Sequence, residues 1–216
     1  MRRFVLTLAV VSAACTGGST PAPSTGAPES TPQSTPEPAS AATPAPAAPS
    51  GKEQLTAAMI GAQDLGPWAV SMGYDLGILR MLVLARPADA QPVTLADFDP
   101  AAPGADASTM KALFAGGAVD GSHPFELLGY DHVVPRGADA VTVSGRSIPR
   151  LAFSWLRVDP DTAARESGRG TALQLHCGDG GLIGGRWVVL ASETPGTDHD
   201  PAPVAELASR LRLCAQ

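Results

Sequence analysis

The sequence predicts an α+β domain: one mostly antiparallel sheet of about five or six strands, flanked by N-terminal and C-terminal helices. Apolar residues recur at helical spacing near both ends of the region 51–216. Between these ends lie short apolar runs separated by Gly-rich or polar turns. Successive strands joined by short turns favour antiparallel pairing. A signal peptide and a disordered stalk are expected to precede this single domain.

Residues 1–14 have the features of an export signal. Arg2 and Arg3 give the start a positive charge, an apolar run begins at Phe4, and small residues lead directly into Cys15. The apolar run is too short to remain as a membrane-spanning helix, which needs about 20 residues. We therefore expect residues 1–14 to act as a signal peptide that delivers the rest of the chain out of the cytoplasm.

The residues around Cys15 resemble the lipobox of bacterial lipoproteins, in which small residues precede a cysteine that is acylated and becomes the mature N-terminus. Ala13, Ala14 and Cys15 match that pattern, while Ser12 stands where the family usually has leucine. The resemblance implies a lipid (palmitate-type) anchor on Cys15 and the cell membrane as a partner through that lipid. Ser12 and Ala14 also fit ordinary signal cleavage, which would give a secreted protein.

Residues 15–50 form a linker composed almost wholly of Pro, Ser, Thr, Ala and Gly after Cys15. Such a segment cannot bury enough apolar surface to offset the entropy of ordering, so we expect disorder. Fully extended, it would reach on the order of 100 Å. A plain spacer and an O-glycosylated stalk both fit this composition.

Charge and composition exclude one class of partner. The chain of 216 residues has a net charge of −6 and no basic stripe that would neutralise phosphates, so we expect no nucleic-acid partner. Lysine is rare while Ala, Gly, Pro and Arg abound, a bias that resembles actinobacterial proteins.

Three helices are predicted. Ser50 and Glu53 have the spacing of a capping box, and the helix that they begin is expected to stop at Gly66–Pro67. A second helix is expected over 107–115. The third runs from Pro201 toward Cys214, with Asp200 as its N-cap.

Six apolar runs between the helices are predicted strands. They cover residues 78–85, 127–134, 140–144, 151–158, 171–177 and 186–193. The glycine-rich stretch 178–185 lacks the Lys-Ser/Thr of a phosphate-binding loop and lies between two predicted strands. We interpret it as a hairpin turn.

A disulfide between Cys177 and Cys214 is predicted. By strand alternation Cys177 lies on the same face as Leu173 and Leu175, and at helical spacing Cys214 shares a stripe with Val204 and Leu207. These apolar faces should meet, and an exported protein folds in an oxidising compartment. Because neighbouring strand residues point to opposite faces, His176 cannot serve as a catalytic base for Cys177.

Other chemical candidates are weak, so we expect no catalytic residues, no metal site and no cofactor. The tightest acid–histidine cluster is Asp198, His199 and Asp200, which we interpret as a solvated loop whose Asp200 caps the last helix. Asp131 and His132 form a weaker pair, and Glu126 has no partner at a spacing that indicates chemistry. Trp155 and Trp187 are expected in the sheet core, the alternative being an outward-facing ligand platform.

The segment Asp64-Leu-Gly-Pro-Trp68 resembles the start of the extracellular domains of actinobacterial cell-envelope lipoproteins and sensor-like domains. This resemblance implies a binding or sensing module and transfers no site residues. Three hypotheses stay open: a non-catalytic module for an envelope ligand or partner protein, an envelope hydrolase without a local motif, and a structural surface protein. The first predicts an apolar groove and the second a polar cleft with convergent titratable groups.

Overall fold

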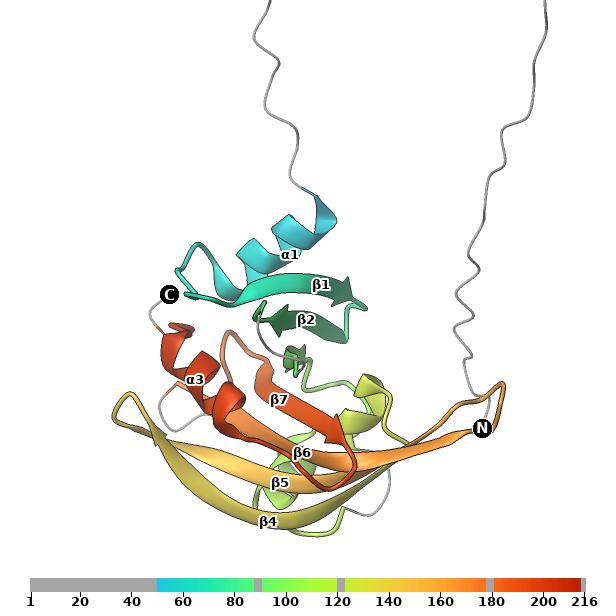
Figure 1. Cartoon of the computed structure of the whole chain (residues 1–216). Coiled ribbons are helices and arrows are strands. Elements are labelled where there is room, and N and C mark those ends of the chain that lie inside the picture. Colours follow the sequence, from blue (N-terminus) through green and yellow to red (C-terminus); the bar gives the residue numbers. More distant parts are fainter. Residues whose placement is uncertain (1–49, 88–90, 120–122, 178–180, 215–216) are drawn as a thin grey trace, which may run out of the picture. The chain divides into compact units, whose positions relative to one another are not determined.

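The computed structural model describes residues 50–87, 91–119, 123–177 and 181–214, all of which belong to one compact unit. The expected signal peptide, Cys15 and all but the last residue of the expected linker lie outside the described residues. The described part is an α+β domain with one open antiparallel sheet of seven strands and three α-helices (Figure 1). The prediction of five or six strands was therefore too low.

The strands pair in the order β1-β2-β3-β7-β6-β5-β4. Their bounds are β1 Ala69–Asp75, β2 Leu79–Ala85, β3 Val93–Phe98, β4 His132–Val143, β5 Arg146–Val158, β6 Arg165–Leu175 and β7 Trp187–Pro195. The helices are α1 Gly51–Ile60, α2 Ala107–Phe114 and α3 Ala202–Arg210, with a short 3₁₀ helix η1 at Pro124–Leu128. After β3 the chain crosses to the far edge of the sheet through α2 and η1, and then returns strand by strand until β7 pairs with β3.

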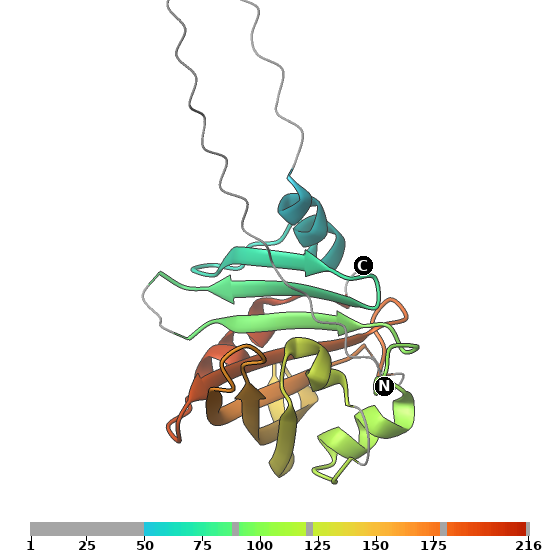
Figure 2. The same ribbon diagram turned by 90° about the vertical axis from the view of Figure 1, so that its right-hand side faces the viewer.

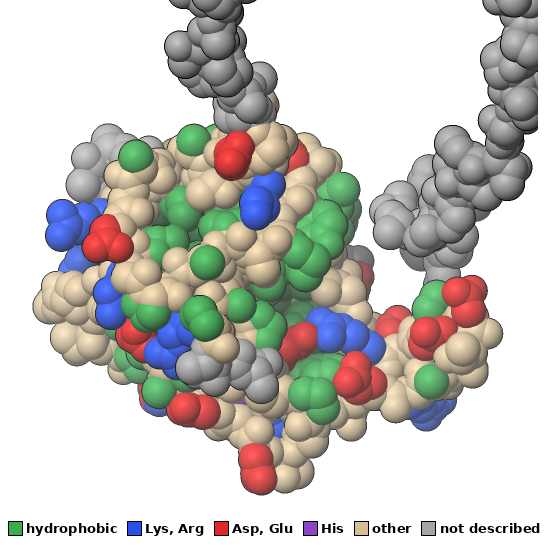
Figure 3. All heavy atoms as spheres, turned by 45° about the horizontal axis from the view of Figure 1, so that its top comes forward, with side chains coloured by type: hydrophobic (Ala, Val, Ile, Leu, Met, Phe, Trp, Pro, Cys, Tyr) green, Lys and Arg blue, Asp and Glu red, His purple; other side chains and the backbone are tan. Residues whose placement is uncertain are grey.

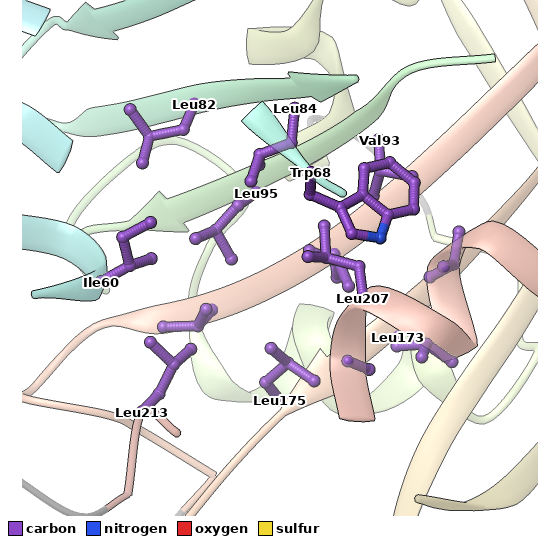
Figure 4. Close-up of a cluster of buried hydrophobic side chains, with 14 of the residues drawn as sticks. Ile60, Trp68, Leu82, Leu84, Val93, Leu95, Leu173, Leu175, Leu207 and Leu213 are labelled. Atoms are coloured by element: carbon purple, nitrogen blue, oxygen red, sulfur yellow. The ribbon is translucent and has the colours of Figure 1, made fainter. Parts of the chain in front are cut away.

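Helices cover both faces of the sheet and give the domain two hydrophobic clusters. On one face α1 and α3 contribute Leu55, Ile60, Val204 and Leu207 to a cluster that also contains Trp68 (Figure 4). On the other face α2 and η1 cover the half formed by β5, β6 and β7 (Figure 2). Their buried side chains there are Met110, Leu113, Phe114 and Phe125.

The N-terminal cap of α1 is the one predicted from the sequence. The Ser50 hydroxyl accepts a hydrogen bond from the Glu53 backbone N–H, and the Glu53 carboxylate accepts one from the Ser50 N–H, which confirms the capping box. The helix ends earlier than predicted, because Gly61 adopts a φ of 67° and breaks the helical conformation before Gly66.

The last helix is also shorter than predicted. The N-cap residue is Pro201 and not Asp200 as predicted. The Asp200 carboxylate, one residue earlier, accepts a hydrogen bond from the Ala202 N–H at 2.9 Å, and α3 ends at Arg210. Leu211 is extended, and the Arg212 N–H donates to the Gln63 side chain at 2.8 Å. This bond ties the C-terminal segment to the loop after α1, so Cys214 lies beyond the helix rather than on its stripe.

Two strands were missed and one predicted strand is wrong. β1 and β3 were not predicted, whereas the run 127–134 spans the end of η1, a turn and only the start of β4. Gly129, with a φ of 89°, ends η1. The short predicted strand at 140–144 is the last part of the long strand β4.

The disulfide prediction is confirmed. Cys177 and Cys214 are bonded, with Cα atoms 5.4 Å apart and a sequence separation of 37 residues. The bond holds the segment after α3 to the end of β6, beside Leu213, which is buried in the cluster under α1 and α3. In the chain-entropy model such a loop stabilises the fold by about 3–4 kcal/mol.

Candidate functional site

The predicted acid–histidine cluster serves to hold a loop in place. The Asp200 carboxylate accepts from the Ala202 N–H at the start of α3, and the Gln91 amide donates to the Asp200 carbonyl at 3.2 Å. His199 Nδ1 lies 3.3 Å from the Gln91 amide nitrogen and 3.4 Å from the Thr194 hydroxyl. Burial lowers the pKa of His199, against the opposing effect of Asp200, so the ring is neutral at pH 7. These contacts join β7 to α3 and leave no open acid–base pair.

The other acid–histidine pair is separated by its hydrogen bonding. The Asp131 carboxylate accepts from the Val158 N–H at 2.7 Å, while His132 begins β4 with an exposed side chain. Glu126 is exposed on η1. Among the described residues, no group of three His, Cys, Asp or Glu side chains is arranged to hold a metal ion.

Trp155 and Trp187 belong to the core, as expected. Both side chains are buried in the cluster under α2 and η1, so they form no outward-facing platform. The Trp155 indole donates to the Arg169 carbonyl at 3.2 Å. The Trp187 indole N–H is buried and has no hydrogen-bond partner among the described residues. Trp187 also lines a groove, and this groove is the best candidate for a binding site.

The groove lies between α2 and the covered face of the sheet and has a volume of about 390 Å³. One wall is formed by α2 residues that recur at helical spacing, and the floor is formed by residues of neighbouring strands. The side chains from α2 and its C-cap are Ala107, Lys111, Phe114 and Ala115, and the rest of the described lining is Pro149, Gln174, Gly181 and Trp187. Apolar and aromatic walls with few polar groups are typical of small-ligand sites.

Strand pairing explains how the floor is assembled. Gln174 of β6 lies directly opposite Val189 of β7, and Arg150 of β5 pairs with Leu173 of β6. Pro149 and Gln174 are therefore neighbours on the same face, with Trp187 diagonally across from Gln174. The next residues along this face, Ala172 and Val189, are small or apolar and belong to the cluster under α2.

Gln174 is the unusual residue of this floor. Its side chain is on a residue only 8% exposed, yet its amide makes no hydrogen bond to any residue that the structure describes. The two polar atoms of this amide do not count among the buried side-chain atoms without partners, so they reach the surface of the groove. The amide therefore offers a donor and an acceptor to water or to a ligand in the groove.

Lys111 adds a positive charge at the same groove. Its ammonium is exposed on the last turn of α2, and it forms no ion pair with any described residue. None of the described residues that line the groove is acidic. The described lining therefore supplies no counter-ion for this charge, although the chain as a whole is acidic.

A larger hollow of about 730 Å³ lies between the end of α1 and the end of α3. Its polar side chains are mostly used already. Gln63 is bonded at both ends of its amide, to the Ile60 carbonyl and the Arg212 N–H, and Asp64 accepts from the Gly66 N–H. Arg210 pairs with Glu206. The groove at Gln174 is therefore the better site, because its polar groups still lack partners.

A separate apolar surface lies on β1 and the β1–β2 hairpin. Among the described residues five large hydrophobic side chains are exposed, and four of them are Met72, Tyr74, Leu76 and Ile78. Met72 and Tyr74 face away from the cluster under α1, since the intervening Gly73 approaches Leu55. Figure 3 brings the α1 side of the domain forward and shows hydrophobic side chains gathered there.

Comparisons with known proteins identify no family. No protein-family model matches the chain, and no curated protein matches it. Within the described ranges no helix is both long and apolar enough to cross a membrane.

Gln174 and Lys111 were not predicted as site residues. By strand alternation Gln174 lies on the face opposite Leu173 and Leu175, as in the structure, but no function was expected of that face. The missing information was that α2 covers it. A polar residue on a strand face that a helix covers indicates a candidate site. Gln174 could have been recognised in this way once α2 was known to cover its face.

Proposed function

We propose that this protein is a lipid-anchored lipoprotein on the extracytoplasmic face of the cell membrane, and that its globular domain is a non-catalytic module that binds an envelope ligand in the groove beneath α2. The observation that carries the binding role is the amide of Gln174, which lines the groove and makes no hydrogen bond to any described residue. Polar groups that have no partner within the protein can form hydrogen bonds with a ligand without first breaking internal ones.

Support for the anchor comes from the sequence. Arg2, Arg3 and the apolar run from Phe4 lead into small residues that end at Cys15, and a Pro/Ser/Thr/Ala-rich linker follows. Attachment through Cys15 would give the domain a tether of about 35 residues, long enough to reach ligands well away from the bilayer.

Support for a non-catalytic role comes from how the titratable groups are used. Asp200 bonds the backbone at the start of α3, Asp131 bonds the backbone at the start of the β4–β5 pair, and Cys177 is oxidised in the disulfide. His199 is held in the loop between β7 and α3 by Gln91 and Thr194. The groove itself holds an amide, an indole and a single ammonium, which are binding groups rather than an acid–base pair.

Affinity selection tests the binding role. The chain from Thr16 to Gln216 would be incubated with soluble fragments of the envelope of the source organism, and retained compounds identified by mass spectrometry. We expect compounds retained by the wild type to be lost with Gln174→Met and to be recovered chemically unchanged. Two control variants should keep them: Gln63→Met, in the larger hollow, and Tyr74→Ser, on the β1 surface.

Two results would contradict the proposal. Equal retention by the wild type and Gln174→Met would move binding away from the groove. Conversion of a retained compound into a product by the wild type would replace the binding module with an enzyme.

A further inference from the structure

Building on the proposed function, we infer that the ligand of the groove is a small carboxylic acid that also carries an amide, such as an N-acylated amino acid or the C-terminal end of a short peptide. Each part of this description comes from a different group that lines the groove.

The amide is inferred from Gln174. A primary amide presents a donor and an acceptor side by side, and its natural complement is another amide, which offers an acceptor and a donor in the same arrangement. A ligand with only acceptors would bond the amide N–H groups of Gln174 but leave its carbonyl without a partner from the ligand. The indole N–H of Trp187 is a further buried donor without a partner in the described chain.

The single negative charge is inferred from Lys111. Among the described residues its ammonium is the only charged group that lines the groove, and none of their carboxylates pairs with it. One positive charge matches one carboxylate. A phosphate carries nearly two negative charges at pH 7 and would leave the second facing a protein of net charge −6.

The small size is inferred from the space and its walls. A volume of about 390 Å³ is at the lower end for small-molecule sites. Phe114, Pro149 and Trp187 supply apolar surface for the carbon skeleton that connects the amide to the carboxylate.

Nuclear magnetic resonance gives a direct test because the chain contains only two lysines, Lys52 and Lys111. The chain from Thr16 to Gln216 would be titrated with N-acetylalanine, in both enantiomers, and with three partial probes. N-acetylalaninamide lacks the carboxylate, acetate lacks the amide, and inorganic phosphate lacks both. We expect N-acetylalanine to shift the Lys111 side-chain signal and the Trp187 indole signal, while Lys52 and the bonded indole of Trp155 stay in place.

The variants separate the two contacts. Lys111→Gln should weaken N-acetylalanine binding about threefold to fivefold, as for an ion pair at a solvent-exposed mouth, and leave N-acetylalaninamide unchanged. Gln174→Met should weaken both probes. Lys52→Gln is the matched control and should change neither.

Several outcomes overturn the inference. The inference is wrong if the wild type binds N-acetylalanine and N-acetylalaninamide with equal affinity, or if Lys111→Gln binds N-acetylalanine as tightly as the wild type does. It is also wrong if phosphate binds more tightly than N-acetylalanine, or if N-acetylalanine shifts no signal. None of these outcomes contradicts the proposed function, which the affinity selection with envelope fragments tests without reference to the probes.

Discussion

Buried polar side chains in this domain fall into two groups, those with partners and those without. Asp97 is 4% exposed and lies between two guanidinium groups, with Arg80 Nε at 3.1 Å and Arg186 Nε at 2.9 Å from its Oδ1 atom. Gln174 is 8% exposed and makes no such bonds with any described residue. The first arrangement stabilises the junction of β2, β3 and the start of β7, and the second leaves binding capacity open.

We expect Asp97→Ala to destabilise the fold by about 3–5 kcal/mol, because two partly buried arginines would lose their common counter-ion. Urea denaturation measures this change. Asp139→Ala is the matched control: Asp139 also pairs with an arginine, Arg150, but its side chain is 55% exposed, so the loss should be below about 1 kcal/mol. Similar losses in both variants would show that the Asp97 network contributes little.

At the scale of elements, helix caps and the strongest apolar strands could be predicted from sequence, and two weaker strands could not. The capping box of Ser50 and Glu53 is local, so three residues of spacing are enough to specify it. β1 has no regular alternation and contains Gly73, and β3 follows Pro92 and contains the charged Asp97. Both strands depend on pairing with β2, which local sequence does not reveal.

Close packing within the sheet gives a second prediction, at Gly168 of β6. A Cβ atom there would lie 2.1 Å from the Thr194 carbonyl oxygen and 2.6 Å from the Trp155 ring, and neither can move freely. We expect Gly168→Ala to cost about 1–3 kcal/mol or more in thermal unfolding. Gly137→Ala is the control, because a Cβ atom at Gly137 meets nothing within 4 Å. A tolerated Gly168→Ala would mean that β6 and β7 are more loosely packed here.

At the scale of the whole molecule, the sequence predicted the α+β class and the Cys177–Cys214 disulfide but not the groove. The disulfide could be predicted because two apolar faces had to meet in an oxidising compartment, even though α3 stops before Cys214. The groove depends on where α2 packs after the long crossover from β3 to β4. That placement is set by tertiary packing, and no local pattern around Lys111 or Gln174 encodes it.

The proposed anchor makes a prediction for the intact chain. We expect the wild type to partition with membranes and to carry acyl chains on Cys15, and we expect Cys15→Ala to be released or to remain unprocessed. Cell fractionation with metabolic labelling by a fatty acid measures both. Wild-type protein found unacylated in the culture medium, with Cys15 as a free thiol, would establish the secreted alternative instead.

The central claim is that Gln174 is kept unpaired for a ligand, and thermal unfolding of Gln174→Met in the absence of any ligand tests it most directly. Because the Gln174 amide makes no hydrogen bond within the described protein, replacing it with an apolar side chain of similar length should keep the Tm within about 2 °C of the wild type or raise it. Gln63→Met, which removes an amide bonded at both ends, should lower the Tm. A fall in Tm for Gln174→Met comparable to that for Gln63→Met would contradict the account, because the amide would then have partners within the folded protein.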